Sequence, residues 1–209
     1  MTSTLSTSST GWTDSFRSPA ALLRFYGLAA VLLGVDLASK YVAQHHLQDG
    51  PGVVVLDRLF HLEWVTNPGA VFGIGAGNRW LFVSISVLAL GFLTYLFAAA
   101  GRRQWGYQLI LGLLLAGVLG NLYDRVVYGH VRDMFRILPG WRWPGDWQVL
   151  GYPPLSREVF PYVFNVADVL LCTGVTLMLL HAFVHDVLRR PATPTVPVGP
   201  GGAEADPPR

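Results

Sequence analysis

Charged residues are scarce in this chain of 209 residues, because only 13% are Asp, Glu, Lys or Arg. Soluble domains usually carry about 25% of these residue types. The formal net charge is only +2, which gives no indication of a nucleic-acid partner. The chain is instead 52% hydrophobic, with a mean hydropathy of +0.41. This balance is typical of a membrane protein.

Cysteine is almost absent, since Cys172 stands alone within an apolar run, where we expect it to be a small packing residue. A single cysteine excludes a disulfide within the chain and a cysteine-rich metal site. His181 and His185 have a metal-ligand spacing, but Ala182 stands where the zinc-peptidase motif has its glutamate. We therefore predict neither a metal nor another cofactor.

The first 20 residues lack the basic start and the short apolar core of a cleavable signal peptide. They are rich in Ser and Thr, and we expect a disordered tail over residues 1–20. Residues 189–209 are rich in Pro, Gly and Ala, and we expect a second disordered tail there. One membrane domain is then predicted over residues 21–188.

Four segments of that domain are long and apolar enough to cross a bilayer, which takes about 20 residues in a helix. The predicted spans cover residues 21–43, 80–100, 107–127 and 162–184. The link over residues 101–106 is so short that the second and third spans must form an antiparallel hairpin. The two long connections consequently lie together on the opposite side of the membrane.

The long connections differ in composition. Residues 53–56 (VVVL) and 60–66 (FHLEWVT) favour strands separated by a turn, which predicts a small sheet at the membrane surface. The second connection contains Trp141, Trp143 and Trp147 among Pro and Gly, and tryptophan suits the membrane–water boundary. We predict an all-α membrane bundle of four transmembrane helices, with a small extracytoplasmic β-sheet and a longer extracytoplasmic loop.

Arginine residues indicate the orientation. Arg102 and Arg103 occupy the very short link, and Arg189 and Arg190 follow the last span, which favours cytoplasmic termini under the positive-inside rule. The long connections also contain arginine, so the count of basic residues does not decide the orientation. The compact pair in the short link favours both termini in the cytoplasm.

Ionisable and amide side chains occur where the bilayer should disfavour them, at about 2.5 to 3.5 kcal/mol for a charge at a helix centre. They are Asp36, Lys40, Asn121, Asp124, Arg125, Asp133, Asn165 and Asp168. All fall toward the membrane face that carries the long connections. Boundary residues that snorkel to water or pair between helices would explain some of them. A small transporter or proton relay, and a catalytically inactive scaffold, are the alternative functions.

Four segments of the chain together resemble signal peptidase II, the lipoprotein signal peptidase, over residues 21 to 185. They are Val35-Asp36-Leu37-Ala38-Ser39-Lys40, Asn67-Pro68-Gly69-Ala70-Val71-Phe72-Gly73, Gly117 to Arg125 continuing to Val131-Arg132-Asp133-Met134-Phe135, and Phe164-Asn165-Val166-Ala167-Asp168. The order and spacing of the four segments make the resemblance specific. The chain departs from the family pattern in three places. Arg132 precedes Asp133 and Met134 follows it, where the family has an apolar residue and Phe. The segment from Asn67 to Phe72 is a variant, and the stretch between Asp133 and Asp168 is longer.

The resemblance implies an intramembrane aspartyl endopeptidase with Asp133 and Asp168 as its catalytic pair. Its substrates would be diacylglyceryl-modified prolipoproteins, cleaved just before the lipidated cysteine at the extracytoplasmic face of the bacterial cytoplasmic membrane. Prolipoproteins and membrane lipid would be its partners. Residues matching supporting positions are Asp36, Lys40, Asn67, Gly117, Asn121, Asp124, Arg125 and Asn165.

The chemistry of two neighbouring carboxylates agrees with this implied activity. Like charges a few ångströms apart cannot both ionise cheaply, so the pair shares one proton. The ionised member can take a proton from water, and the protonated member can support the oxyanion and protonate the leaving nitrogen. The sequence alone does not assign these two roles to individual residues.

Overall fold

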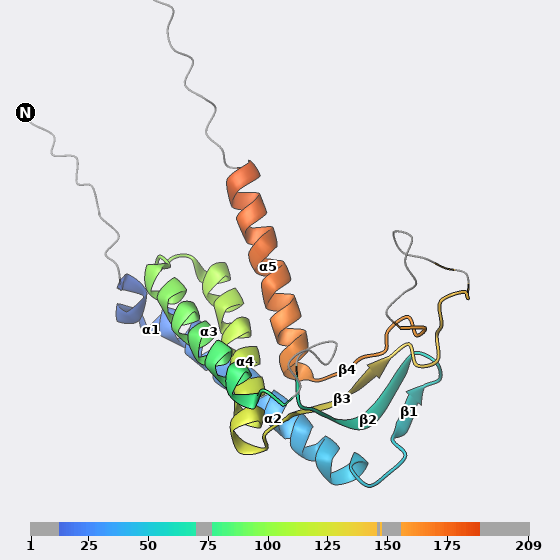
Figure 1. Cartoon of the computed structure of the whole chain (residues 1–209). Helices are drawn as coiled ribbons and strands as arrows, with labels where there is room; N and C mark the ends of the chain where they lie inside the picture. The colour runs from blue at the N-terminus through green and yellow to red at the C-terminus, as the bar shows by residue number, and fades with distance from the viewer. Residues whose placement is uncertain (1–12, 70–76, 146, 148–155, 189–209) are drawn as a thin grey trace, which may run out of the picture.

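The computed structural model describes residues 13–69, 77–145, 147 and 156–188 (Figure 1). Four of its helices are long and apolar enough to cross a membrane. The first runs from Pro19 to Leu47 as α1 (Pro19–Leu22), a π-helical turn (Leu23–Gly27) and α2 (Leu28–Leu47), followed by α3 (Arg79–Ala99), α4 (Trp105–Val127) and α5 (Val166–Leu188). The four predicted apolar helices are therefore confirmed, with ends that differ from the prediction by a few residues.

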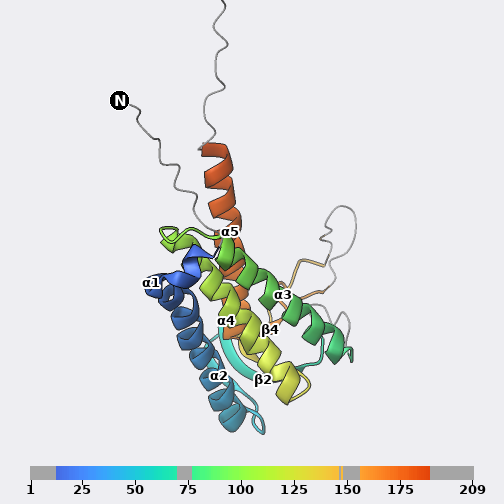
Figure 2. The same cartoon turned by 90° about the vertical axis from the view of Figure 1, so that its left-hand side faces the viewer.

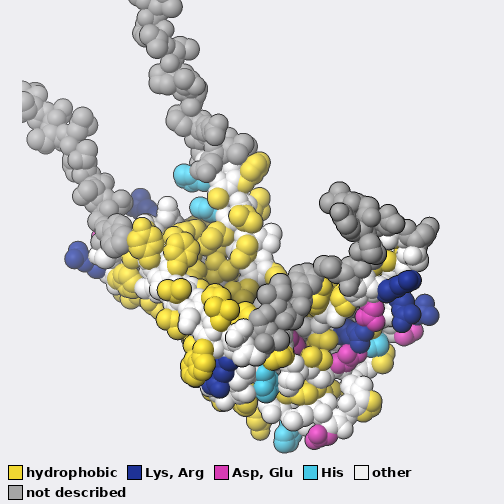
Figure 3. All heavy atoms as spheres, viewed as in Figure 1, with side chains coloured by type: hydrophobic (Ala, Val, Ile, Leu, Met, Phe, Trp, Pro, Cys, Tyr) yellow, Lys and Arg dark blue, Asp and Glu magenta, His cyan; other side chains and the backbone are white. Residues whose placement is uncertain are grey.

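Helix α4 is the centre of the bundle and packs against α2, α3 and α5. Figure 2 shows α4 between α2 and α3. Phe25, Phe97 and Leu111 are fully buried in the core, and the rings of Phe25 and Phe97 stack at 4.3 Å. Large apolar side chains also cover the outside of the helices (Figure 3), for example Leu88, which is 73% exposed. A helix bundle that is apolar both inside and outside is suited to lipid.

Two glycines of α4 allow the start of α5 to approach closely. A Cβ atom on Gly117 would lie 2.8 Å from the carbonyl oxygen of Ala167, and one on Gly120 would lie 3.1 Å from Cβ of Ala167 and would collide with Oδ2 of Asp36 on α2. Small residues at such crossings are common in membrane helices because they let backbones come together. Gly117, predicted as a supporting residue, thus shapes the α4–α5 contact.

A four-stranded antiparallel sheet adjoins one end of the bundle (Figure 1), and its strand order is β1-β2-β3-β4. The strands are β1 (Val53–Leu56), β2 (Phe60–Asn67), β3 (Val131–Ile137) and β4 (Val163–Phe164). The sequence predicted β1 and β2, whereas β3 falls in a connection that we expected to be a loop and β4 falls at the start of the predicted fourth span. Strand β3 follows α4 and β4 precedes α5, so the sheet joins the helix that carries Asn121, Asp124 and Arg125 to the helix that carries Asp168.

The expectation of a disordered tail over residues 1–20 is wrong for residues 13–20. Asp14–Arg17 form a 3₁₀ turn, Thr13 N–H donates to the Ala98 carbonyl at 3.1 Å, and the Ser15 hydroxyl donates to the Ala100 carbonyl. These bonds tie the segment to the end of α3. The tail predictions for residues 1–12 and 189–209 concern residues outside those that the structure describes.

Cys172 is exposed on α5, so the expectation of a buried packing residue is also wrong. Apolar composition alone could not tell an inward-facing from an outward-facing position, because a membrane helix is apolar on both sides.

Candidate active site

Asp168 is fixed at the first turn of α5 by a reciprocal cap. Asn165 precedes the helix, and its Oδ1 accepts the Asp168 N–H at 3.0 Å. In return, Oδ2 of Asp168 accepts the Asn165 N–H at 3.1 Å. This is a capping box, in which two side chains satisfy N–H groups at the helix start. The helix dipole at this position favours a negative charge on Asp168.

Asp133 lies on β3 and is only 1% exposed. Each of its carboxylate oxygens accepts an amide hydrogen, from Asn165 Nδ2 at 2.6 Å and from Asn67 Nδ2 at 3.1 Å. Burial, together with the nearby charge of Asp168, raises the pKa of Asp133 from its ordinary 3.8 to about 6. The hydrogen bonds from Asn165 and Asn67 act in the opposite direction and limit that rise.

Amide side chains join the two aspartates into one network. Asn121 Nδ2 donates to Asp168 Oδ1 at 2.8 Å. Asn165 Nδ2, which donates to Asp133, also lies 3.3 Å from Asn121 Oδ1. Asn165 is therefore bonded to both aspartates, one through its side-chain amide and the other through the helix cap. The structure brings together the two residues that the sequence predicted as a pair.

A chain of buried ion pairs lies behind this network. Lys40 Nζ is 2.8 Å from Asp36 and 3.3 Å from Asp124, and Asp124 is 2.7 Å from Arg132. All four side chains are at most 2% exposed, so two acids and two bases balance one another out of contact with water. Breaking such a buried pair from one side leaves an uncompensated charge, which costs about 3 to 5 kcal/mol. Lys40 also donates to Asn121 Oδ1 at 3.2 Å, which connects the charges to the aspartate network.

The two acids of this chain also position the elements that carry the aspartate pair. Asp36 Oδ1 accepts the N–H of Ala167 at 2.8 Å, at the start of α5. Asp124 Oδ2 accepts the N–H of Arg132 at 3.0 Å, next to Asp133 on β3. Asp36 and Asp124 therefore hold the backbone next to the two aspartates through hydrogen bonds.

Arg125 was predicted as a supporting residue. Its guanidinium donates to the carbonyl oxygens of Gly69 and Asn121, both at 3.3 Å, and lies 5.0 Å from the centre of the Phe82 ring. Arg125 thus connects α4 to the segment after β2 and to α3. Residues 70–73 of the predicted motif lie outside the residues that the structure describes.

Arg132 is a site residue that the sequence reasoning missed, because it was treated as a departure from the family pattern. Its guanidinium donates to Asp124 Oδ1 through both Nε and Nη2, at 3.1 and 2.7 Å, and to Gln44 at 3.1 Å. The charges gave one signal in the sequence. Asp36 and Asp124 carry two negative charges, and Lys40 balances only one of them. A fourth charged residue was needed, and Arg132 supplies it.

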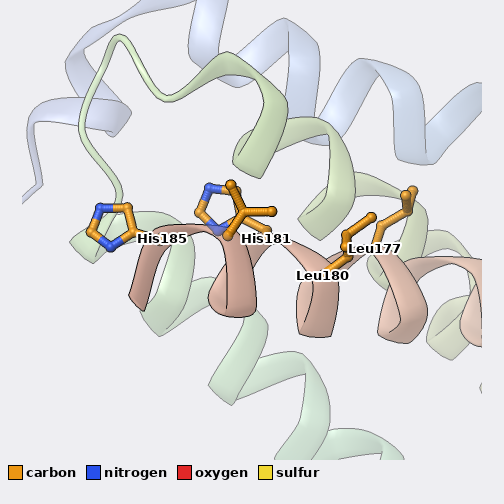
Figure 4. A pocket seen from close by; sticks show the side chains of 5 residues that line it. Leu177, Leu180, His181 and His185 are labelled. Atoms are coloured by element: carbon orange, nitrogen blue, oxygen red, sulfur yellow. The ribbon is translucent and has the colours of Figure 1, made fainter. Parts of the chain in front are cut away.

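The histidine pair lies apart from this network. His181 and His185 line a pocket of about 260 Å³ on α5 with Leu177, Leu180 and Val184 (Figure 4). Thirteen residues of helix separate His181 from Asp168, which is roughly 20 Å at 1.5 Å per residue. Within the described part of the chain, no three His, Cys, Asp or Glu side chains are grouped so that they could hold a metal ion.

The fold and the site together define a multi-pass membrane protein. At one end of its helices, asparagine side-chain amides hold a pair of aspartates. A family model described as "Signal peptidase (SPase) II" matches residues 28–184. The chain belongs to the signal peptidase II family.

Curated relatives agree with this assignment. The chain is 31% identical over 156 residues to a lipoprotein signal peptidase of Desulfitobacterium hafniense, covering 75% of this chain and 90% of the relative. It is 34% identical over 165 residues to that of Pseudomonas syringae pv. tomato, covering 77% and 86%. A solved bacterial membrane enzyme, determined by the in meso method at 2.3 Å resolution, is 27% identical with a TM-score of 0.64, covering 79% of this chain and 91% of its own.

Proposed function

We propose that this protein is an aspartyl endopeptidase that cleaves the signal peptide from diacylglyceryl-modified prolipoproteins, just before the lipidated cysteine. Membership of the family supports a protease, and the curated relatives are named lipoprotein signal peptidases. The observation that carries the proposal is the link between Asp133 and Asp168 through the single side chain of Asn165.

Asp133 is the member of the pair that we assign as the proton carrier. It is almost fully buried, and its pKa of about 6 keeps a proton available close to neutral pH. Asp168 lies at a helix start, where a negative charge is favoured, and it is only half-buried. The two carboxyl groups thus have different surroundings, and we assign the role of base to Asp168 from its place at the helix start.

The reaction then follows in two proton transfers. Ionised Asp168 takes a proton from a water molecule, and the water oxygen attacks the carbonyl carbon of the scissile peptide bond. Protonated Asp133 donates a hydrogen bond to the developing oxyanion. As the carbon–nitrogen bond breaks, a proton from the pair passes to the leaving nitrogen. Asn121 and Asn165 hold the two carboxyl groups in place through this cycle.

We place the active site at the extracytoplasmic face of the bacterial cytoplasmic membrane, with both termini in the cytoplasm. The aspartate pair lies where the sheet meets the bundle, and the link with Arg102 and Arg103 lies at the opposite end of α4. The signal helix and the diacylglyceryl group of the precursor would contact the apolar helices. The sheet would support the extended residues around the cleaved bond.

Reconstitution with a defined substrate tests the proposal. Full-length wild type, Asp133→Asn and Asp168→Asn are incorporated into vesicles with a diacylglyceryl-modified precursor peptide, and the products are identified by mass spectrometry. We expect wild type to cleave before the lipidated cysteine and each variant to lose at least about 10²-fold in rate, the size of a general acid–base contribution.

Asp57→Asn is the matched control, because it removes the same charge from an exposed turn between β1 and β2. It should cleave at the wild-type rate. Normal cleavage by Asp133→Asn or Asp168→Asn would exclude that residue from the mechanism. Cleavage at another bond, or equal cleavage of a precursor without lipid, would contradict the proposed substrate.

A further inference from the structure

The segment between β3 and β4 contains three tryptophans that have no part in the proposed mechanism. We call its described residues, 138–145, 147 and 156–160, the tryptophan arm. In Figures 1 and 2 the arm leaves the free end of the sheet and rises in the direction in which α5 runs away from it. The arm thus lies on the side of the sheet where the apolar helices define the position of the bilayer.

The tryptophan arm is a short antiparallel ladder. Trp143 N–H donates to the Arg157 carbonyl at 2.9 Å, and Val159 N–H donates to the Trp141 carbonyl at 2.9 Å. Arg142 and Glu158 form the bridge between these two bonds. The backbone of the arm is therefore paired, and the positions of its side chains are set by that pairing.

An ion-pair clamp fastens the arm to the sheet. Arg136 on β3 donates through Nη2 to Glu158 of the arm at 2.9 Å, and through Nη1 to both carboxylate oxygens of Glu63 on β2 at 3.1 Å. In addition, Leu138 N–H donates to the Leu59 carbonyl in the turn before β2 at 3.0 Å. These bonds fasten the arm to β3, the strand that carries Asp133.

Large apolar side chains of the arm face outward. Trp141 is 49% exposed and Trp147 is 45% exposed, while the rings of Trp143 and Trp147 stack at 4.2 Å. Leu59 beside the arm is 49% exposed. An indole ring combines an apolar body with a polar N–H, and it is enriched where acyl chains meet headgroups.

Basic side chains alternate with these aromatic ones. Arg142 and Arg157 are exposed on the two sides of the ladder, and Arg58 is exposed in the neighbouring turn. Figure 3 shows Lys and Arg side chains gathered at this free end of the sheet. The acids nearby are Glu63 and Glu158, which pair with Arg136, and Asp57. Arginine forms paired hydrogen bonds with phosphate oxygens, and basic residues next to a membrane attract anionic lipid.

We propose that the tryptophan arm is a membrane anchor that inserts Trp141 and Trp147 into the headgroup region of the bilayer. Arg142 and Arg157 bind the phosphates of anionic lipids at the same depth. The clamp through Arg136 then holds β3, and with it Asp133, at a fixed height above the acyl chains. The occupant of this surface is lipid, because its aromatic and basic groups alternate and because the sheet that carries it adjoins four helices that are long and apolar enough to cross a membrane.

Fluorescence quenching tests the anchor on the full chain. In a Cys172→Ser background, Trp147→Cys is labelled with an environment-sensitive dye and reconstituted into vesicles of phosphatidylcholine and phosphatidylglycerol. Asp49→Cys, in the exposed turn after α2, is the matched position. We expect the dye at position 147 to show blue-shifted emission, stronger quenching by a headgroup nitroxide lipid and weaker quenching by acrylamide than the dye at position 49.

The lipid charge is tested separately with the double variant Arg142→Gln and Arg157→Gln. The double variant is made in the dye-labelled Trp147→Cys protein. Adding phosphatidylglycerol to phosphatidylcholine vesicles should increase the nitroxide quenching of the labelled parent protein, and we expect the double variant to lose this increase. Equal acrylamide quenching at positions 147 and 49 would overturn the proposal. Protection of position 147 that appears only after a precursor peptide is added would also overturn it, and would assign the arm to substrate.

Discussion

At the scale of single residues, the side chains that donate hydrogen bonds to the aspartate pair are asparagine amides. The buried ion pairs lie behind these amides. Asn67, Asn121 and Asn165 donate to the two carboxyl groups, whereas Lys40 donates to Asn121 and acts on Asp133 only through its charge. An amide donor favours a carboxylate less than a neighbouring cation does, because it carries no net charge. This arrangement allows the pKa of Asp133 to rise to about 6.

The pH dependence of the proposed activity follows from that pKa. The active form needs a proton on Asp133, so kcat/KM should fall as the pH rises through about 6. The hydrogen bond from Asn67 lowers the pKa of Asp133. We therefore expect Asn67→Ala to raise that pKa and to move the alkaline limb of the kcat/KM profile to higher pH, as measured in vesicles over a pH series.

Asn78→Ala, at the exposed start of α3, is the comparison for this experiment and should leave the limb in place. A limb that stays fixed or moves to lower pH in Asn67→Ala would show that Asp133 is not the group that titrates.

Residues that are polar inside apolar spans could be found from the sequence, because their cost in lipid makes them conspicuous. Asp36, Lys40 and Asp124 belong to this group, and the structure gathers them as expected. Arg132 could not be found in this way, since it lies outside the spans and its burial depends on β3 packing against α2 and α4. Gln44 was missed for a similar reason.

At the scale of the elements, the crossing of α4 and α5 determines where the aspartate pair forms. Gly120 lies against Asp36, whose other oxygen accepts the N–H of Ala167. We expect Gly120→Ala to push these groups apart, to destabilise the fold by about 1 to 3 kcal/mol as overpacking does, and to lower cleavage. Thermal unfolding in detergent, followed together with activity, measures both effects.

Gly106→Ala is the matched substitution in the same helix, because a Cβ atom there meets nothing within 4 Å. Alanine is the better helix former by about 0.8 to 1 kcal/mol, so this variant should be as stable as wild type or slightly more stable. The close-approach argument would be wrong if both variants behaved alike.

The elements also show which parts of a fold a sequence can predict. The four helices were predicted because each needs only a continuous apolar run, which is a local property. Strands β3 and β4 were not predicted, because β3 is defined by pairing with a distant strand, for example Thr66 opposite Arg132. Arg132, Asp133 and Arg136 also interrupt the alternation of apolar and polar residues by which strands are recognised.

At the scale of the whole molecule, the sheet lies at one end of the helices and the α3–α4 link at the other (Figure 1). We predict that the sheet is extracytoplasmic and that both termini are cytoplasmic. In a Cys172→Ser background, a cysteine at Asp57 should react with a membrane-impermeant maleimide in intact spheroplasts. A cysteine at Arg102 should react only after the membrane is permeabilised, and the reverse pattern would refute the orientation.

The buried charges have a consequence for how the protein is made. Asp36 and Lys40 are four residues apart, and Asp124 and Arg132 are eight apart, so each acid leaves the ribosome close to its own base. Each half of the chain can therefore enter the bilayer with little uncompensated charge. The bond from Ala167 to Asp36 spans 131 residues and cannot form until the last helix has been synthesised. A nascent chain accordingly remains without its paired aspartates until the start of α5 has been synthesised and has packed against α2.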